Sequence, residues 1–144
     1  MQEKQNYQNH TRWLPPFHFF LSPLLLVSLI YFTVRIFQEP SWDRGMFLLL
    51  LIGIITISFL SRIQVLTVQN RVIRLEERLR YKELLSPDLA ERAQNLKTSE
   101  MIGLRFAGDE ELPGLVERTL SGEFENVKEI KLAVKNWRGD HLRA

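Results

Sequence analysis

The most constraining feature of this chain is a run without proline from Gly45 to Leu85. Residues 46–60 read MFLLLLIGIITISFL and include no ionisable residue. The remainder is charged, but it keeps apolar residues at alternating steps of three and four, the spacing of a heptad seam. These residues, called the seam below, are Val65, Val68, Val72, Leu75 and Leu79. Because nothing forces the helix to stop, we expect a transmembrane helix that continues into a cytosolic stalk as a coiled-coil segment.

A second apolar segment, residues 17–37, precedes this run and is long enough to span a bilayer. Pro23 lies inside it and leaves two interpretations open. Either the helix is kinked at Pro23, or Ser22 caps a helix that begins at Pro23, with residues 17–21 in the membrane interface. The apolar region is too long for a signal peptide, and bulky residues follow it where a cleavage site needs small ones. We therefore expect a retained span.

The two apolar segments predict a hairpin, because only residues 38–44 separate them. Both termini then lie on the same side of the membrane. Basic residues are concentrated after the second segment, whereas the turn itself contains only Arg44. The positive-inside bias places such a basic flank in the cytoplasm. We therefore expect a multi-pass protein of the plasma membrane with both termini cytoplasmic.

The predicted fold class is an all-α membrane protein whose transmembrane hairpin carries a small helical module. We expect a flexible arm over 1–16, the hairpin over 17–66 (17–37, turn 38–44, 45–66), a stalk over 67–85 and a cytosolic module over 86–144. Helix signals in the module begin at Ser86-Pro87-Asp88 and again near Thr98. Further helices are expected from Gly108 to Gly122 and from Asn126 to Trp137.

The predicted last helix places a basic stripe beside an apolar one. The candidate interaction residues are Lys128, Lys131, Lys135, Trp137 and Arg138. They could dock on anionic lipid, or the apolar stripe could face the module's own core. Residues 109–125 carry a net charge of −5 and residues 126–144 a net charge of +3. Because opposite charges in adjacent helices favour pairing with each other, we favour packing within the chain.

The seam also leaves two interpretations open. It spans about two and a half heptads, too short to hold strands together alone in water, but tethering in a membrane raises the local concentration. The seam could thus join copies into a homo-oligomer, or pack on the soluble helices of its own chain. Thr56, Ser58 and Ser61 could likewise serve helix–helix packing or bond back to their own helix.

Catalytic, metal and cofactor signals are not found in the sequence. The absence of cysteine excludes disulfides and thiolate chemistry, and the three histidines do not have metal-ligand spacing. Glu76 and Glu77 point in two directions on a stalk expected to be solvated. No phosphate loop or nucleophile motif occurs, and no nucleic-acid-binding motif accompanies the basic stripe. We expect no enzyme, no cofactor and no nucleic acid partner.

Several short motifs together resemble a family of uncharacterised bacterial two-span membrane proteins, a domain of unknown function. They are His18-Phe19, Arg74-Leu75-Glu76-Glu77-Arg78-Leu79-Arg80, Leu104-Arg105-Phe106-Ala107, Asp109-Glu110-Glu111-Leu112-Pro113, Lys128-Glu129-Ile130-Lys131 and Trp137-Arg138. The resemblance covers nearly the whole chain and implies a bacterial inner-membrane protein, but it supplies no activity.

From these patterns we expect a membrane-tethered structural or interaction scaffold, or an adaptor for an unknown protein partner. The seam and the region around Trp137 are its expected contact surfaces. The alternative is a regulatory sensor whose basic amphipathic last helix docks on anionic lipid.

Overall fold

The structure is a computed structural model that describes residues 6–9 and 13–140. Its contacts divide the chain into two compact units, with the boundary between Leu66 and Thr67. Of the described residues, the first unit, called the apolar hairpin, comprises 13–66, and the second, called the helical module, comprises 67–140 together with 6–9. All regular elements of the described residues are helices, as the sequence predicts. Half of the predicted flexible arm, residues 1–5 and 10–12, lies outside the described residues.

The first helix of the apolar hairpin passes through Pro23 without a break. A π-helical segment, η1 (Pro16–Leu21), continues directly into α1 (Ser22–Gln38). Both the backbone N–H and the hydroxyl of Ser22 donate to the Phe17 carbonyl, five residues earlier. The wider turn accommodates the proline ring, which would clash with a carbonyl of a regular α-turn. The alternative in which Ser22 caps a helix that begins at Pro23 is therefore wrong, because Ser22 lies inside a helix that begins before it.

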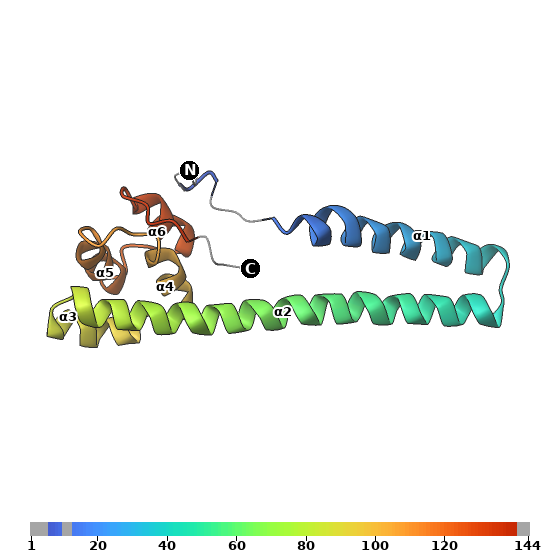
Figure 1. Ribbon diagram of the computed structural model, residues 1–144, viewed down its shortest axis with the longest axis horizontal. Coiled ribbons are helices and arrows are strands. Elements are labelled where there is room, and N and C mark those ends of the chain that lie inside the picture. The colour runs from blue at the N-terminus through green and yellow to red at the C-terminus, as the bar shows by residue number, and fades with distance from the viewer. Residues whose placement is uncertain (1–5, 10–12, 141–144) are drawn as a thin grey trace. The chain divides into compact units, whose positions relative to one another are not determined.

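Helix α2 (Trp42–Leu84) is continuous over 43 residues and antiparallel to α1 (Figure 1). Within the hairpin the Phe32 and Phe47 rings stack, with their centroids 5.9 Å apart. The hydroxyls of Thr56 and Ser58 donate to carbonyls of their own helix at 2.8 and 2.9 Å. These two hydroxyls thus form hydrogen bonds back to their own helix, which was the second of the two interpretations of the sequence. Hydroxyls on helices often do so.

The helical module wraps short helices around the end of α2. They are α3 (Pro87–Arg92), the 3₁₀ turn η2 (Ala93–Asn95), α4 (Thr98–Leu104), α5 (Leu112–Leu120) and α6 (Val127–Ala133). Ser86 caps α3 as predicted, since its hydroxyl accepts the N–H of Leu89 at 3.4 Å. Asn126 caps α6 by accepting from Lys128 and Glu129. Gly122, at φ 77°, follows α5 in the left-handed conformation that glycine adopts most easily.

Two predicted helix boundaries are wrong. Helix α5 begins at Leu112 rather than Gly108, and α6 ends at Ala133 rather than Trp137. Both differences accompany pairing between the two segments, since the Glu111 carboxylate accepts the backbone N–H groups of Lys135 and Asn136. Ala107 and Trp137 form an antiparallel β-bridge, and Arg138 donates its N–H to the Phe106 carbonyl at 2.8 Å. Tertiary pairing has overridden local helix propensity here.

The core of the module is apolar and continuous from the end of α2 to the extended tail after α6. The largest side chains within it, each at most 2% exposed, are Tyr81, Met101, Leu104, Phe106, Leu112, Val116 and Ile130. Helix α4 crosses α6 closely at Gly103. A Cβ atom placed there would lie 3.0 Å from Ile130 Cγ2 and 3.3 Å from Val127 Cγ1. The crossing therefore requires a residue without a side chain.

Gly103→Leu should consequently lower the free energy of unfolding of the module by about 1–3 kcal/mol, through overpacking. Gly114→Leu is the matched control, since a Cβ at Gly114 in α5 has no neighbouring atom within 4 Å. We expect this control to leave the stability unchanged or slightly higher, because leucine favours helix more than glycine does. Urea titration of the full chain in mild detergent, followed by tryptophan fluorescence, measures both. Equal losses would contradict the close crossing.

Candidate functional site

A buried arginine joins helix α2 to the loop between α4 and α5. The Arg80 side chain is 8% exposed and donates three hydrogen bonds to two acceptor atoms. Its Nη2 lies 2.6 Å from the Ala107 carbonyl and 2.6 Å from Asp109 Oδ1, and its Nε lies 3.1 Å from the same carboxylate oxygen. Glu77 Oε2 lies 3.5 Å from Nη1. We call Glu77, Arg80, Ala107 and Asp109 the polar junction.

The Glu77 carboxylate of the polar junction is buried. Glu77 is 4% exposed, and burial raises its pKa above the ordinary range, although the charges of Arg80 and Arg138 oppose this. Burial also raises the pKa of the neighbouring Tyr81 hydroxyl, and the negative charge of Glu77 adds to the effect. The tyrosine stays neutral, so the charges at the junction are those of Glu77, Arg80 and Asp109. Losing one partner of a buried ion pair destabilises a fold, because the other charge is then buried without a partner.

The loop that accepts Arg80 also binds the extended tail after α6. The Glu111 carboxylate accepts the backbone N–H groups of Lys135 and Asn136 at 3.0 and 2.9 Å, and that of Gly108 at 3.2 Å. A Cβ on Gly108 would lie 3.1 Å from the Asn136 carbonyl oxygen, so the tail approaches the loop closely. One carboxylate thus fixes both the loop and the tail.

An aromatic pair closes the same region. The buried Phe106 ring lies 4.8 Å from the Trp137 ring. Arg105 lies 4.6 Å from the centre of the Phe106 ring and Lys131 Nζ lies 5.4 Å from it, both within cation–π range. Arg105, 8% exposed, also pairs with Asp140 at 3.3 Å. The motifs around residues 77–80, 104–107, 109–111 and 137–138 therefore meet at one place in the fold.

These contacts place the residues predicted for the basic helix. Lys131 and Trp137 lie against Phe106, while Lys128, Lys135 and Arg138 are exposed. The apolar stripe of that helix faces inward, with Ile130 1% and Val134 6% exposed. Packing within the chain, favoured from the sequence, is what the structure has. The hydrogen bonds from the tail after α6 to the Glu111 carboxylate come from the backbone N–H groups of Lys135 and Asn136.

The expectation of a fully solvated stalk is wrong for Glu77. Ile73, Glu77 and Tyr81 on α2, with Leu85 directly after it, form a second stripe at four-residue spacing, and the module buries all four. Three of these four residues are apolar, but the charged Glu77 among them interrupts the apolar pattern, so the sequence did not predict the stripe. Arg80, Arg105 and Glu111 were missed for another reason. Their acceptors and partners are mostly backbone groups and residues distant in the sequence.

The seam lies on the other side of α2 and remains uncovered. Val65, Val68, Val72, Leu75 and Leu79 are 44%, 60%, 47%, 62% and 55% exposed. Residues two positions apart on a helix point about 200° away from each other. Leu75 therefore points away from buried Glu77, and Leu79 away from buried Tyr81. The module uses one face of α2 and leaves the seam free, so the seam does not pack on the soluble helices of its own chain.

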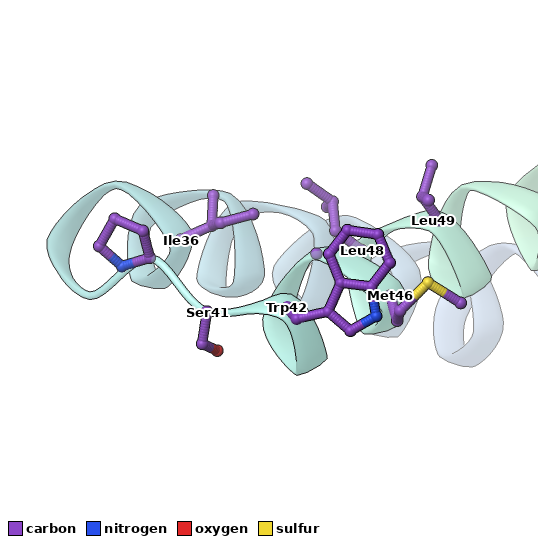
Figure 2. Close-up of a pocket in the computed structure, with 8 residues that line it drawn as sticks. Ile36, Ser41, Trp42, Met46, Leu48 and Leu49 are labelled. Carbon is purple, nitrogen blue, oxygen red and sulfur yellow. The ribbon is translucent and has the colours of Figure 1, made fainter.

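An apolar depression lies at the turn between α1 and α2 (Figure 2). It is lined by Ile36, Pro40, Ser41, Trp42, Gly45, Met46, Leu48 and Leu49. None of these side chains is titratable, so the depression offers no acid, base or metal ligand. Within residues 6–9 and 13–140, no cluster of three potential metal ligands occurs either.

These features define an all-helical protein in which two helices, Pro16–Gln38 and Trp42–Leu84, are long and apolar enough to cross a membrane. A small helical module completes the described chain. The chain belongs to the DUF6526 family, a family of unknown function, which it matches over residues 1–144. The resemblance to a domain of unknown function is thereby confirmed. No curated protein and no solved structure matches the chain.

The polar junction should contribute strongly to the stability of the module. Arg80→Met removes the cation and leaves the Glu77 carboxylate buried, which should lower the free energy of unfolding by about 3 kcal/mol. Arg74→Met, on the exposed surface of the same helix, should change it by less than about 0.5 kcal/mol. Urea titrations of the two full-length variants in detergent make the comparison. A loss with Arg80→Met no larger than that of the control would contradict a stabilising junction.

The raised pKa of Glu77 predicts a pH dependence. Since the folded chain binds this proton more tightly than the unfolded chain, the Glu77 contribution to stability is greatest at low pH and falls as the pH rises through the raised pKa. Glu77→Gln removes that titration. We therefore expect the free energy of unfolding of the variant, minus that of the parent chain, to increase as the pH rises from about 4. Glu91→Gln, an exposed substitution on α3, should show no such trend.

Proposed function

We propose that this protein is a membrane-anchored scaffold that associates with copies of itself through the seam of α2. The observation that carries the proposal is the exposure of all five seam residues on a helix whose opposite face is already packed. A heptad stripe of this kind is typical of a helix that pairs with another helix. The module at the end of α2 is then the part presented to the cytoplasm, where an unidentified protein partner would bind.

The surface of the apolar hairpin supports membrane anchoring. Large apolar side chains cover both helices, and Phe37 is 83%, Leu49 63% and Phe59 63% exposed. The most apolar windows of the two helices are 0% and 6% buried. A core helix of a soluble protein would bury such residues against its own chain. Trp42, 84% exposed at the turn, suits the aromatic belt at a membrane interface.

The charge distribution supports a cytoplasmic location of both termini. Five arginines follow the second apolar stretch on α2, at positions 62, 71, 74, 78 and 80. In the turn, Arg44 contacts both the carboxylate and the backbone carbonyl of Glu39, and Arg35 pairs with the same carboxylate at 3.0 Å. The basic flank therefore lies on α2 beyond its apolar stretch, where the positive-inside bias favours a cytoplasmic end.

The alternative proposal, a sensor that docks α6 on anionic lipid, has less support. Ile130 and Val134 are core residues, so docking could use Leu132, which is 56% exposed, together with Lys128 and Lys135. One leucine provides little apolar area for insertion compared with a full amphipathic face. Self-association leaves the module intact, whereas docking of the complete apolar stripe requires it to open.

Two single-cysteine variants test the scaffold, because the chain contains no cysteine. Leu75→Cys should form an intermolecular disulfide in oxidised native membranes, since paired seam positions lie within the roughly 7 Å between Cα atoms that a disulfide tolerates. Arg74→Cys, the adjacent exposed position on the side away from the seam, should form much less. Non-reducing electrophoresis of carbonate-washed membranes measures both.

Arg74→Cys also reports the orientation in the membrane. A membrane-impermeant maleimide should label it only after the inner membrane is opened. Labelling from the outside of intact spheroplasts would overturn the cytoplasmic location, and a chain that leaves the membrane in carbonate would overturn the anchoring. Equal crosslinking of the two cysteine variants, or none at Leu75→Cys, would overturn self-association through the seam.

A further inference from the structure

We propose that the seam pairs with a second copy of this chain as a parallel, in-register, two-stranded coiled coil whose orientation is selected by four charged residues: Arg71, Glu76, Arg78 and Glu83. This inference rests on the proposed function and deepens it, because it specifies the partner, its direction and its register. The proposal rests on the positions of these four charges, which lie on either side of the exposed seam.

The spacing of the seam assigns the heptad positions. Val65, Val72 and Leu79 occupy position a, and Val68 and Leu75 occupy position d. Position g of the two successive heptads is then Arg71 and Arg78. Position e is Glu76 and, in the following heptad, Glu83. Each g arginine is thus followed five residues later by an e glutamate.

This arrangement favours parallel strands in register. In that geometry a g residue of one helix faces the e residue of the next heptad on the other helix. Arg71 of one copy would face Glu76 of the second copy, and Arg78 would face Glu83, with both pairs repeated by the two-fold symmetry. Antiparallel strands would place g against g and e against e, so arginine would meet arginine. Anchoring in one membrane independently orders both helices in the same direction.

The structure leaves these side chains available. Arg71, Glu76 and Glu83 are exposed and Arg78 is half-buried. None of the four forms an ion pair within the part of the chain that the structure describes. In contrast, Arg80 lies on the module side of the same helix and forms ion pairs with Glu77 and Asp109. The charges beside the seam have therefore not been used by the module.

The composition of the seam indicates the number of strands and where the pairing ends. Valine at a with leucine at d favours two strands, and the central pair of the seam, Val72 with Leu75, has this composition, whereas Val68 at d and Leu79 at a do not. The next d position is Lys82, whose charge would not be buried between two helices. Leu75 and Leu79 also line a groove with Ala90 of α3 and Gln94 of η2, so the module borders the seam at this end. The pairing should therefore span Val65 to Leu79.

Complementary charge reversals in the full-length chain test the inference. One chain carries Arg71→Glu with Arg78→Glu, the other carries Glu76→Arg with Glu83→Arg, and both carry Leu75→Cys. A size tag on one of them separates the three disulfide products on a gel. Each chain alone would place like charges in contact, whereas the mixed pair restores opposite charges at all four contacts. Co-expression should therefore give the mixed product about fivefold over either homodimer, because charge complementarity selects the partner.

Control reversals use exposed residues away from the seam, with the same change in net charge. They are Arg74→Glu with Lys97→Glu in one chain and Glu91→Arg with Glu110→Arg in the other. These chains should give the statistical mixture of products. Oxidation of membranes containing only the Leu75→Cys parent measures seam contact without any charge reversal.

The outcomes separate the inference from the proposed function. Preferential mixed product with the seam reversals, and not with the controls, supports pairing that is selected by charges beside the seam. The disulfide that reports this product joins position 75 of one copy to position 75 of the other, and the two d positions face each other only when the strands are parallel and in register. Crosslinking of the parent together with a statistical mixture from the seam reversals would overturn the selection by these charges but leave the scaffold in place. No crosslinking of the Leu75→Cys parent would overturn the scaffold and this inference with it.

Discussion

The module depends on the way Arg80 is held by the rest of the fold. Its guanidinium is removed from water on α2, and it is compensated by a carbonyl and a carboxylate from the loop after α4 together with a carboxylate of its own helix. Removing a charge from water is costly, so the loop must take the one conformation that supplies these acceptors. The same loop then receives the tail after α6 through Glu111 and the Phe106 ring. These linked contacts explain why short helices, each only marginally stable alone, form one module.

Helix α2 consequently has two faces with different tasks. The face that includes Ile73, Glu77 and Tyr81 is part of the module's core, whereas the face that includes Val72, Leu75 and Leu79 is exposed. The two faces lie on opposite sides of one rigid helix. A change in the seam should therefore affect association without unfolding the module, and a change at Arg80 should have the opposite effect. This separation makes the scaffold proposal open to mutagenesis.

The sequence predicted the elements well and their tertiary uses less well. Strong local signals, such as the apolar runs of the hairpin and the caps at Ser86 and Asn126, correspond to helices in the structure. The late start of α5 and the early end of α6 could not be predicted, because they accompany pairing between segments distant in the sequence, including a β-bridge between residues 30 positions apart. The π-helical segment before Pro23 was also missed, since several backbone solutions fit one proline. The polar junction escaped because its partners are backbone groups and distant residues.

Self-association through so short a seam is plausible only for an anchored chain. In water, about two and a half heptads would not repay the entropy of bringing two chains together. Two helices confined to one bilayer already share orientation and a high local concentration, so much of that entropy has been lost before they meet. A weak seam is then sufficient to decide which helices remain together, and modest charge pairs are sufficient to decide their register. The balanced charges of α2 beside its apolar stripe are what such a division of tasks requires: the bilayer supplies proximity and the stalk supplies selectivity.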